Sequence, residues 1–175
     1  MTAATVELKI YTGTSAANEN PASGDASNWN LMNTDAYDST GTDYQSAANR
    51  ISVPSSGTNY SYERWMRLKC TGDFNQITNV EFYKSAGTLS DANLDLLAGS
   101  TDTAATPSNS ASTVATTTKG GWDEESEAID ITPAGGISTS NTYSNYAVVQ
   151  LKVPSTVTTP GDISPQTITF KYDES

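Results

Sequence analysis

The chain has 175 residues, with 9 Lys and Arg against 20 Asp and Glu, no His and one Cys, which gives a formal net charge of −11. This composition excludes His-based catalytic triads, His metal sites, Cys-rich zinc sites and an intrachain disulfide. The acid excess also argues against nucleic-acid binding, which needs a basic surface that displaces counterions.

Alternation of apolar and polar residues between turn-forming residues is the signature of half-buried β-strands. In the segment 64–70, Met66, Leu68 and Cys70 fall on the expected core side and Trp65 on the opposite side. Cys70 is therefore interpreted as a small buried hydrophobe. Five segments carry the pattern clearly: Thr5–Tyr11, Arg64–Cys70, Ile77–Lys84, Tyr146–Val153 and Thr167–Tyr172. Four more are candidates: Arg50–Val53, Leu94–Ala98, Ser112–Thr117 and Ala128–Thr132.

Two long polar stretches lie between the expected strands, Thr12–Asn49 and Ser100–Gly121. The first is long for a loop in a compact domain, so it either contains irregular strands or is held by a neighbouring subunit. Part of the Thr-rich second stretch is expected to pair as an edge strand. With no sustained helical period and no linker, we predict one all-β domain over residues 1–175. Its fold is a two-sheet β-sandwich, jelly-roll or Ig-like, with extended loops at about 12–49 and 100–121.

The densest group of carboxylates is the run Asp123–Glu127, followed by Asp130. Several carboxylates can bind Ca²⁺, but the run lacks the spacing of a calcium loop and is better interpreted as a solvated acidic loop. The chain also lacks a Gly-x-Ser-x-Gly elbow, a Ser-x-x-Lys box and a phosphate-binding loop. A glycosidase pair among the 20 acids is an unconstrained alternative. The sequence therefore predicts a protein that is not an enzyme and holds no cofactor or metal.

Three aromatic residues, Tyr60, Tyr62 and Trp65, gather after a turn-forming segment at 54–59. Aromatic residues are enriched in cores and subunit interfaces, and this is the favoured interpretation of the group. The alternative is a glycan-stacking platform, because rings beside Asn and Asp can bind the face of a sugar.

Three segments resemble poorly characterised virion structural proteins of tailed bacteriophages. They are PSSGTNYSYERW at 54–65, NVEFY at 79–83 and QTITFKYDE at 166–174, within a resemblance that covers about half of the chain. The resemblance implies a virion structural protein, most simply a capsid decoration (cement) protein that braces neighbouring capsomers. A neck, tail or baseplate protein, or a carbohydrate-binding host-adhesion module on the virion, is the alternative. No catalytic residue is carried over.

The expected partners follow from that resemblance: the major capsid protein or other virion proteins, and further copies of this chain, but neither nucleic acid nor membrane. The residues before Val6 show no basic region followed by an apolar run, so no secretory signal is expected. No stretch reaches the ~18 apolar residues of a membrane span. We therefore expect assembly in the host cytoplasm and residence in the virion.

Overall fold

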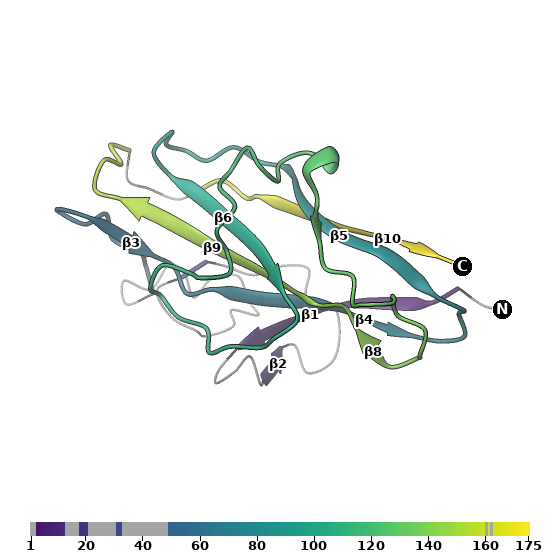
Figure 1. Ribbon diagram of the computed structural model, residues 1–175. Coiled ribbons are helices and arrows are strands. Elements are labelled where there is room, and N and C mark those ends of the chain that lie inside the picture. The colour runs from purple at the N-terminus through teal and green to yellow at the C-terminus, as the bar shows by residue number, and fades with distance from the viewer. Residues whose placement is uncertain (1–2, 13–17, 21–30, 33–48, 160, 162) are drawn as a thin grey trace.

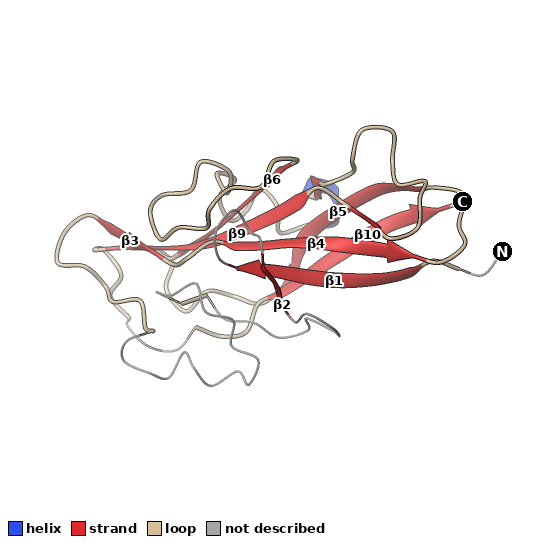
Figure 2. Cartoon of the chain, turned by 90° about the horizontal axis from the view of Figure 1, so that it is seen from below, coloured by secondary structure: helices blue, strands red, loops and turns tan. Residues whose placement is uncertain are grey.

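The computed structural model describes residues 3–12, 18–20, 31–32, 49–159, 161 and 163–175. These residues form two antiparallel β-sheets that pack face to face (Figure 1; Figure 2), so the predicted all-β sandwich is confirmed. The larger sheet contains β1 (Thr5–Thr12), β2 (Asn18–Asn20), β3 (Thr58–Tyr60), β4 (Arg64–Thr71), β6 (Asp95–Thr101), β8 (Thr142–Tyr143) and β9 (Tyr146–Pro154). The smaller sheet contains β5 (Ile77–Ala86), β7 (Ile129–Asp130) and β10 (Thr167–Glu174), and a 3₁₀ turn, η3, spans Glu125–Glu127.

The topology is simpler than the number of strands suggests, because some short strands continue longer ones. β3 and β4 follow one another along the same side of β9, and β8 precedes β9 along the same side of β4. β6 pairs with the other side of β9, and β1 pairs with the other side of β4. The order β1-β4-β9-β6, with β5 and β10 in the second sheet, is the A-B-E-D and C-F arrangement of Ig-like sandwiches. Of the two topologies that the sequence leaves open, the structure has the Ig-like one.

The main core fills the space between the sheets. Met66, Leu68 and Cys70 of β4 face Val80 and Phe82 of β5, and all five are at least 96% buried. The alternation read from the sequence therefore gives the correct inward face for these two strands.

The five clear strand predictions are confirmed, and the observed strands extend them by one or two residues. Of the weaker candidates, Leu94–Ala98 corresponds to β6 and Ala128–Thr132 shrinks to the two residues of β7. The prediction of a strand at Arg50–Val53 is wrong. Ile51 and Val53 instead pack from a loop onto an apolar cluster at one end of the sandwich, so their apolar character reflects end packing. Ser112–Thr117 forms only one isolated bridge, Thr117 with Ala98.

The extended loop expected at 12–49 lies largely outside the described residues, apart from the end of β1, β2, residues 31–32 and Asn49. The second expected loop, 100–121, is described in full and begins with the last two residues of β6. Its residues 102–118, called the flap below, lie over the outer face of the larger sheet. Ala104, Val114 and Ala115 of the flap pack there in a cluster with Trp65 and Tyr146. The sandwich therefore has buried apolar surface on both faces of its larger sheet.

Candidate interaction surfaces

The three aromatic residues singled out from the sequence occupy different environments. Tyr60 ends β3 and is half-buried, Tyr62 is half-buried in the link to β4, and Trp65 on β4 is 1% exposed. As predicted, Trp65 lies on the face of β4 that points away from the main core. Its side chain is nevertheless buried, because the flap covers it. The structure brings Tyr60 and Trp65 into one cluster and leaves Tyr62 outside it.

The flap is fixed to the sheet by buried polar side chains. Gln150 of β9 is fully buried; its Nε2 donates to the carbonyls of Ser61 (2.9 Å) and Ser110 (2.7 Å), and its Oε1 accepts from the Ser112 amide (3.0 Å). The carboxylate of Glu63, which is 5% exposed, accepts from the Trp65 indole at 3.0 Å and from the Ser108 amide at 3.3 Å. Buried polar groups of this kind hold one arrangement because each lost hydrogen bond leaves a desolvated group unpaired.

Beside the flap, Arg67 of β4 lies within a cage of three tyrosine rings. Its guanidinium carbon is 4.7 Å, 4.2 Å and 4.5 Å from the ring centroids of Tyr11, Tyr143 and Tyr146. Such contacts attract a cation to the negative face of the ring. Because the cation is the chain's own arginine, the cage ties β1, β4 and the β8–β9 segment together and is already filled. Sequence reasoning missed this cluster, although the aromatic residues and the arginine occupy outward-facing positions on neighbouring strands.

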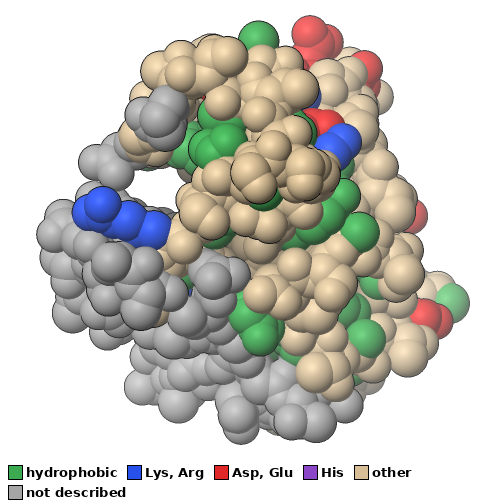
Figure 3. All heavy atoms as spheres, turned by 90° about the vertical axis from the view of Figure 1, so that its left-hand side faces the viewer, with side chains coloured by type: hydrophobic (Ala, Val, Ile, Leu, Met, Phe, Trp, Pro, Cys, Tyr) green, Lys and Arg blue, Asp and Glu red, His purple; other side chains and the backbone are tan. Residues whose placement is uncertain are grey.

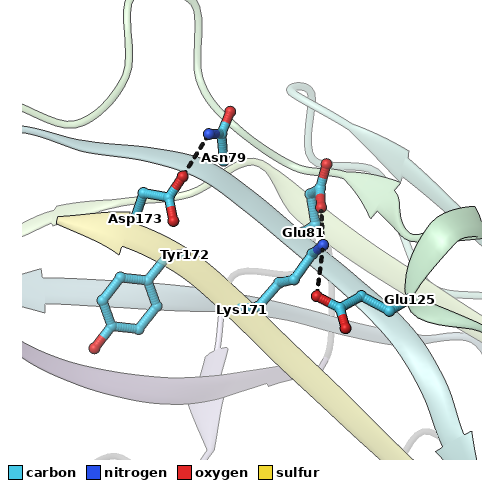
Figure 4. Close-up of a pocket in the computed structure, with 6 residues that line it drawn as sticks. All are labelled: Asn79, Glu81, Glu125, Lys171, Tyr172 and Asp173. Atoms are coloured by element: carbon cyan, nitrogen blue, oxygen red, sulfur yellow. Dashed lines mark hydrogen bonds and ion pairs between the residues drawn. The ribbon is translucent and has the colours of Figure 1, made fainter.

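A shallow pocket of about 310 Å³ lies on the outer face of the smaller sheet (Figure 4). Lys171 of β10 reaches Glu81 of β5 at 2.9 Å and Glu125 of η3 at 3.3 Å, and these carboxylates raise the pKa of the lysine. Asn79 donates to Asp173 at 2.6 Å from a backbone with φ of 49°, where β5 contains a bulge. The charged groups that line this pocket therefore satisfy one another across the two strands.

Tyr172 extends away from these charges, toward the opposite side of β10 (Figure 4). It is 38% exposed and is the only exposed large hydrophobic side chain among the described residues. Figure 3 shows the face at the left-hand end of Figure 1, where hydrophobic side chains appear as separate areas among backbone and other side chains. Among the described residues, Tyr172 on β10 is thus the one large apolar side chain that solvent reaches freely.

The acidic run is exposed to solvent, as expected for a solvated loop: Glu124, Glu125 and Glu127, in and just before η3, are all exposed. The described part of the chain contains no group of three or more His, Cys, Asp or Glu side chains placed to hold a metal ion. Among the acids that the structure describes, Asp91 accepts the most hydrogen bonds: it is 6% exposed and accepts from the backbone amides of Asn93, Thr158 and Thr159 at 2.8–3.0 Å. These backbone hydrogen bonds hold the pKa of Asp91 far below its usual range.

No helix among the described residues is long and apolar enough to span a membrane. Comparisons of the chain with protein-family models, with curated proteins and with solved structures found no match.

Proposed function

We propose that this protein is a structural component of a tailed-phage virion, most simply a capsid decoration protein that braces neighbouring capsomers. The observation that carries the proposal is where the resembling segments lie in the fold. The segments 79–83 and 166–174 form β5 and β10, which pair with Phe82 opposite Phe170. Two of the three segments that resemble phage virion proteins therefore lie on adjoining strands of the smaller sheet, and the third, 54–65, forms β3 and the start of β4 in the larger sheet.

The mechanism is passive contact. A rigid sandwich presents Ser-, Thr- and Asn-rich loops, which form wet, specific interfaces by hydrogen bonding. Many copies on a lattice add individually small binding free energies. The net charge of −11 keeps a densely repeated protein soluble and repels packaged DNA. The partners in this proposal are the major capsid protein or other virion proteins, and the role is not enzymatic.

A contact role is favoured over a glycan-stacking role for Tyr60, Tyr62 and Trp65. A sugar platform needs rings whose faces are open to the ligand. Trp65 is 1% exposed, and its indole N–H is already bonded to Glu63. Sugar binding by Trp65 would require the flap to leave the sheet.

The proposal is tested by imaging purified phage particles that carry the protein, at side-chain resolution. Density that fits the sandwich at the outer capsid surface is the expected result, with the polar loops against capsid subunits. Density only at the neck, tail or baseplate would overturn the decoration role. Absence of the protein from purified particles, measured by quantitative mass spectrometry, would overturn the virion role altogether.

A further inference from the structure

The described strands differ in how their outer edges are protected. Thr117 of the flap bonds both ways with Ala98 of β6 at 2.9 Å, and a Cβ added to Gly99 would meet the Val114 carbonyl at 1.9 Å, so the flap covers the edge of β6. β7 and β2 are only two and three residues long. β10 has eight residues, and no described residue pairs with its outer edge. Long, open edges invite pairing with another strand.

The backbone groups on this open edge can be identified from the hydrogen bonds of β5. The Lys84 amide donates to the Trp122 carbonyl, and the Val80 carbonyl accepts from the Ile131 amide, so the even-numbered residues from Val80 to Lys84, after the bulge, face away from β10. By alternation, Glu81 and Tyr83 exchange hydrogen bonds with Lys171 and Thr169, their register partners on β10. The N–H and C=O groups of Ile168, Phe170 and Tyr172 therefore point outward from the edge.

The same three residues carry the apolar side chains of β10. Ile168 and Phe170 are half-buried against the core, and Phe170 stacks on Phe82 with ring centroids 5.7 Å apart. Tyr172 continues this row and is exposed. An added strand would thus gain both backbone hydrogen bonds and apolar contact.

The usual guard of such an edge is a lysine. Lys171 is the only lysine on β10, and its ammonium is drawn onto Glu81 and Glu125 over the outer face of the sheet. Its ammonium is therefore held over the outer face of the sheet and does not cover the backbone groups along the open edge.

We propose that β10 is a self-association site, at which a second copy of this chain adds its own β10 in antiparallel register centred on Phe170. Two-fold symmetry about an axis normal to the sheet keeps paired residues on the same face. The centre at Phe170 places Ile168 opposite the partner's Tyr172 and Thr169 opposite the partner's Lys171. A centre at Lys171 would place two lysines opposite each other. Only the Phe170 register pairs all three apolar residues with apolar residues, and the two small sheets become one continuous sheet.

Two copies that each carry a net charge of −11 repel one another, and salt screens that repulsion. We therefore expect a monomer–dimer equilibrium in which the dimer is favoured by protein concentration and by moderate salt. Sedimentation equilibrium of the full chain, over a range of concentrations at two salt concentrations, measures it.

The register is tested with opposite charges at one position. Thr169→Lys places a lysine opposite the partner's Lys171 and is expected to weaken the dimer at least tenfold, whereas Thr169→Glu is expected to preserve or strengthen it. Thr156→Lys, at an exposed position in the turn after β9 and outside β10, makes the same change in net charge and is the control. Far-UV circular dichroism verifies that each variant is folded.

Amide exchange gives a second readout that locates the interface. The outward amides of Ile168 and Phe170 should exchange more slowly as the concentration of the wild-type chain rises, and should stay fast in Thr169→Lys. A wild-type chain that remains monomeric at all concentrations overturns the proposal. A dimer that responds equally to Thr169→Lys and Thr156→Lys, with no protection of these amides, overturns it as well.

Discussion

Asp91 connects two loops at one end of the sandwich through a single carboxylate. Oδ1 accepts from the backbone and the side chain of Asn93, while Oδ2 accepts from Thr158 and from the Thr159 amide. All of these donors favour the ionised form, which lowers the pKa of Asp91 in the folded chain.

A lowered pKa in the folded state sets the sign of a pH effect on stability. Asp91 contributes its stabilisation fully above the unfolded pKa of about 4, and loses it as the pH falls below 4 toward the folded pKa. We expect Asp91→Asn to lower the urea midpoint at pH 7 and to flatten its decline below pH 4. Urea unfolding at a series of pH values measures both. An unchanged pH profile in the variant would show that the fall in stability below pH 4 comes from other acids. Asp73→Asn, which changes an exposed acid, is the control.

Cys70 is a residue whose chemistry is suppressed by packing. It is fully buried, and its burial, together with the negative charge of Glu174, raises the pKa of the thiol to about 11. A thiol reagent at pH 8 is therefore expected to react slowly with the folded chain and immediately in denaturing urea, since the thiolate is the reactive species. Ser100→Cys adds a thiol at an exposed position of β6 and should react at once. Rapid labelling of Cys70 in the folded chain would mean that β4 opens readily.

At the scale of elements, the flap depends on Gln150. Gln150→Leu keeps the approximate size of the side chain but leaves the Ser61 and Ser110 carbonyls and the Ser112 amide without their partner. We expect a loss of about 2–3 kcal/mol in the free energy of unfolding. We also expect faster cleavage of the flap by elastase, which accepts its exposed Ala105 and Ala111. The measurements are urea unfolding and limited proteolysis.

The control for that substitution is Gln76→Leu, which removes one hydrogen bond to the Gly135 carbonyl near the surface. It should cost no more than about 1 kcal/mol and leave elastase cleavage unchanged. Equal stability losses in the two variants would show that the buried network does not hold the flap.

The sequence predicts the elements well where one face of a strand meets the core. The pattern of β4 and β5 identifies their inward residues, because a period of two follows directly from the pleat. The same pattern places Trp65 on a polar face, but its burial depends on contact with Val114 and Ala115, almost fifty residues later in the chain. Gln150 is similar, since a polar residue at an outward position gives no sign of a covering segment. The anchoring of the flap by Gln150 and Glu63 is a long-range property that local periodicity does not contain.

At the scale of the whole molecule, Trp122 joins the two sheets between β6 and β5. It is fully buried, its indole N–H donates to the Leu96 carbonyl of β6 at 3.1 Å, and its ring lies 5.8 Å from that of Phe82 on β5. Its own backbone carbonyl accepts from the Lys84 amide of β5. One residue from the segment between β6 and β7 thus contacts both layers and closes this side of the core.

We expect Trp122→Ala to cost about 3–5 kcal/mol, since the cavity it leaves is bordered by two different sheets. Because both sheets share this contact, the loss should appear as one cooperative transition shifted to lower urea concentration. Circular dichroism, which reports on the strands of both sheets, and the reactivity of Cys70 on β4 of the larger sheet should give the same urea midpoint. Tyr83→Ala, which removes a half-buried ring from the outer face of β5, should cost less and is the matched control. Two separated transitions in Trp122→Ala would mean that each sheet retains its own stability, and that the sandwich is held together mainly by contacts other than this residue.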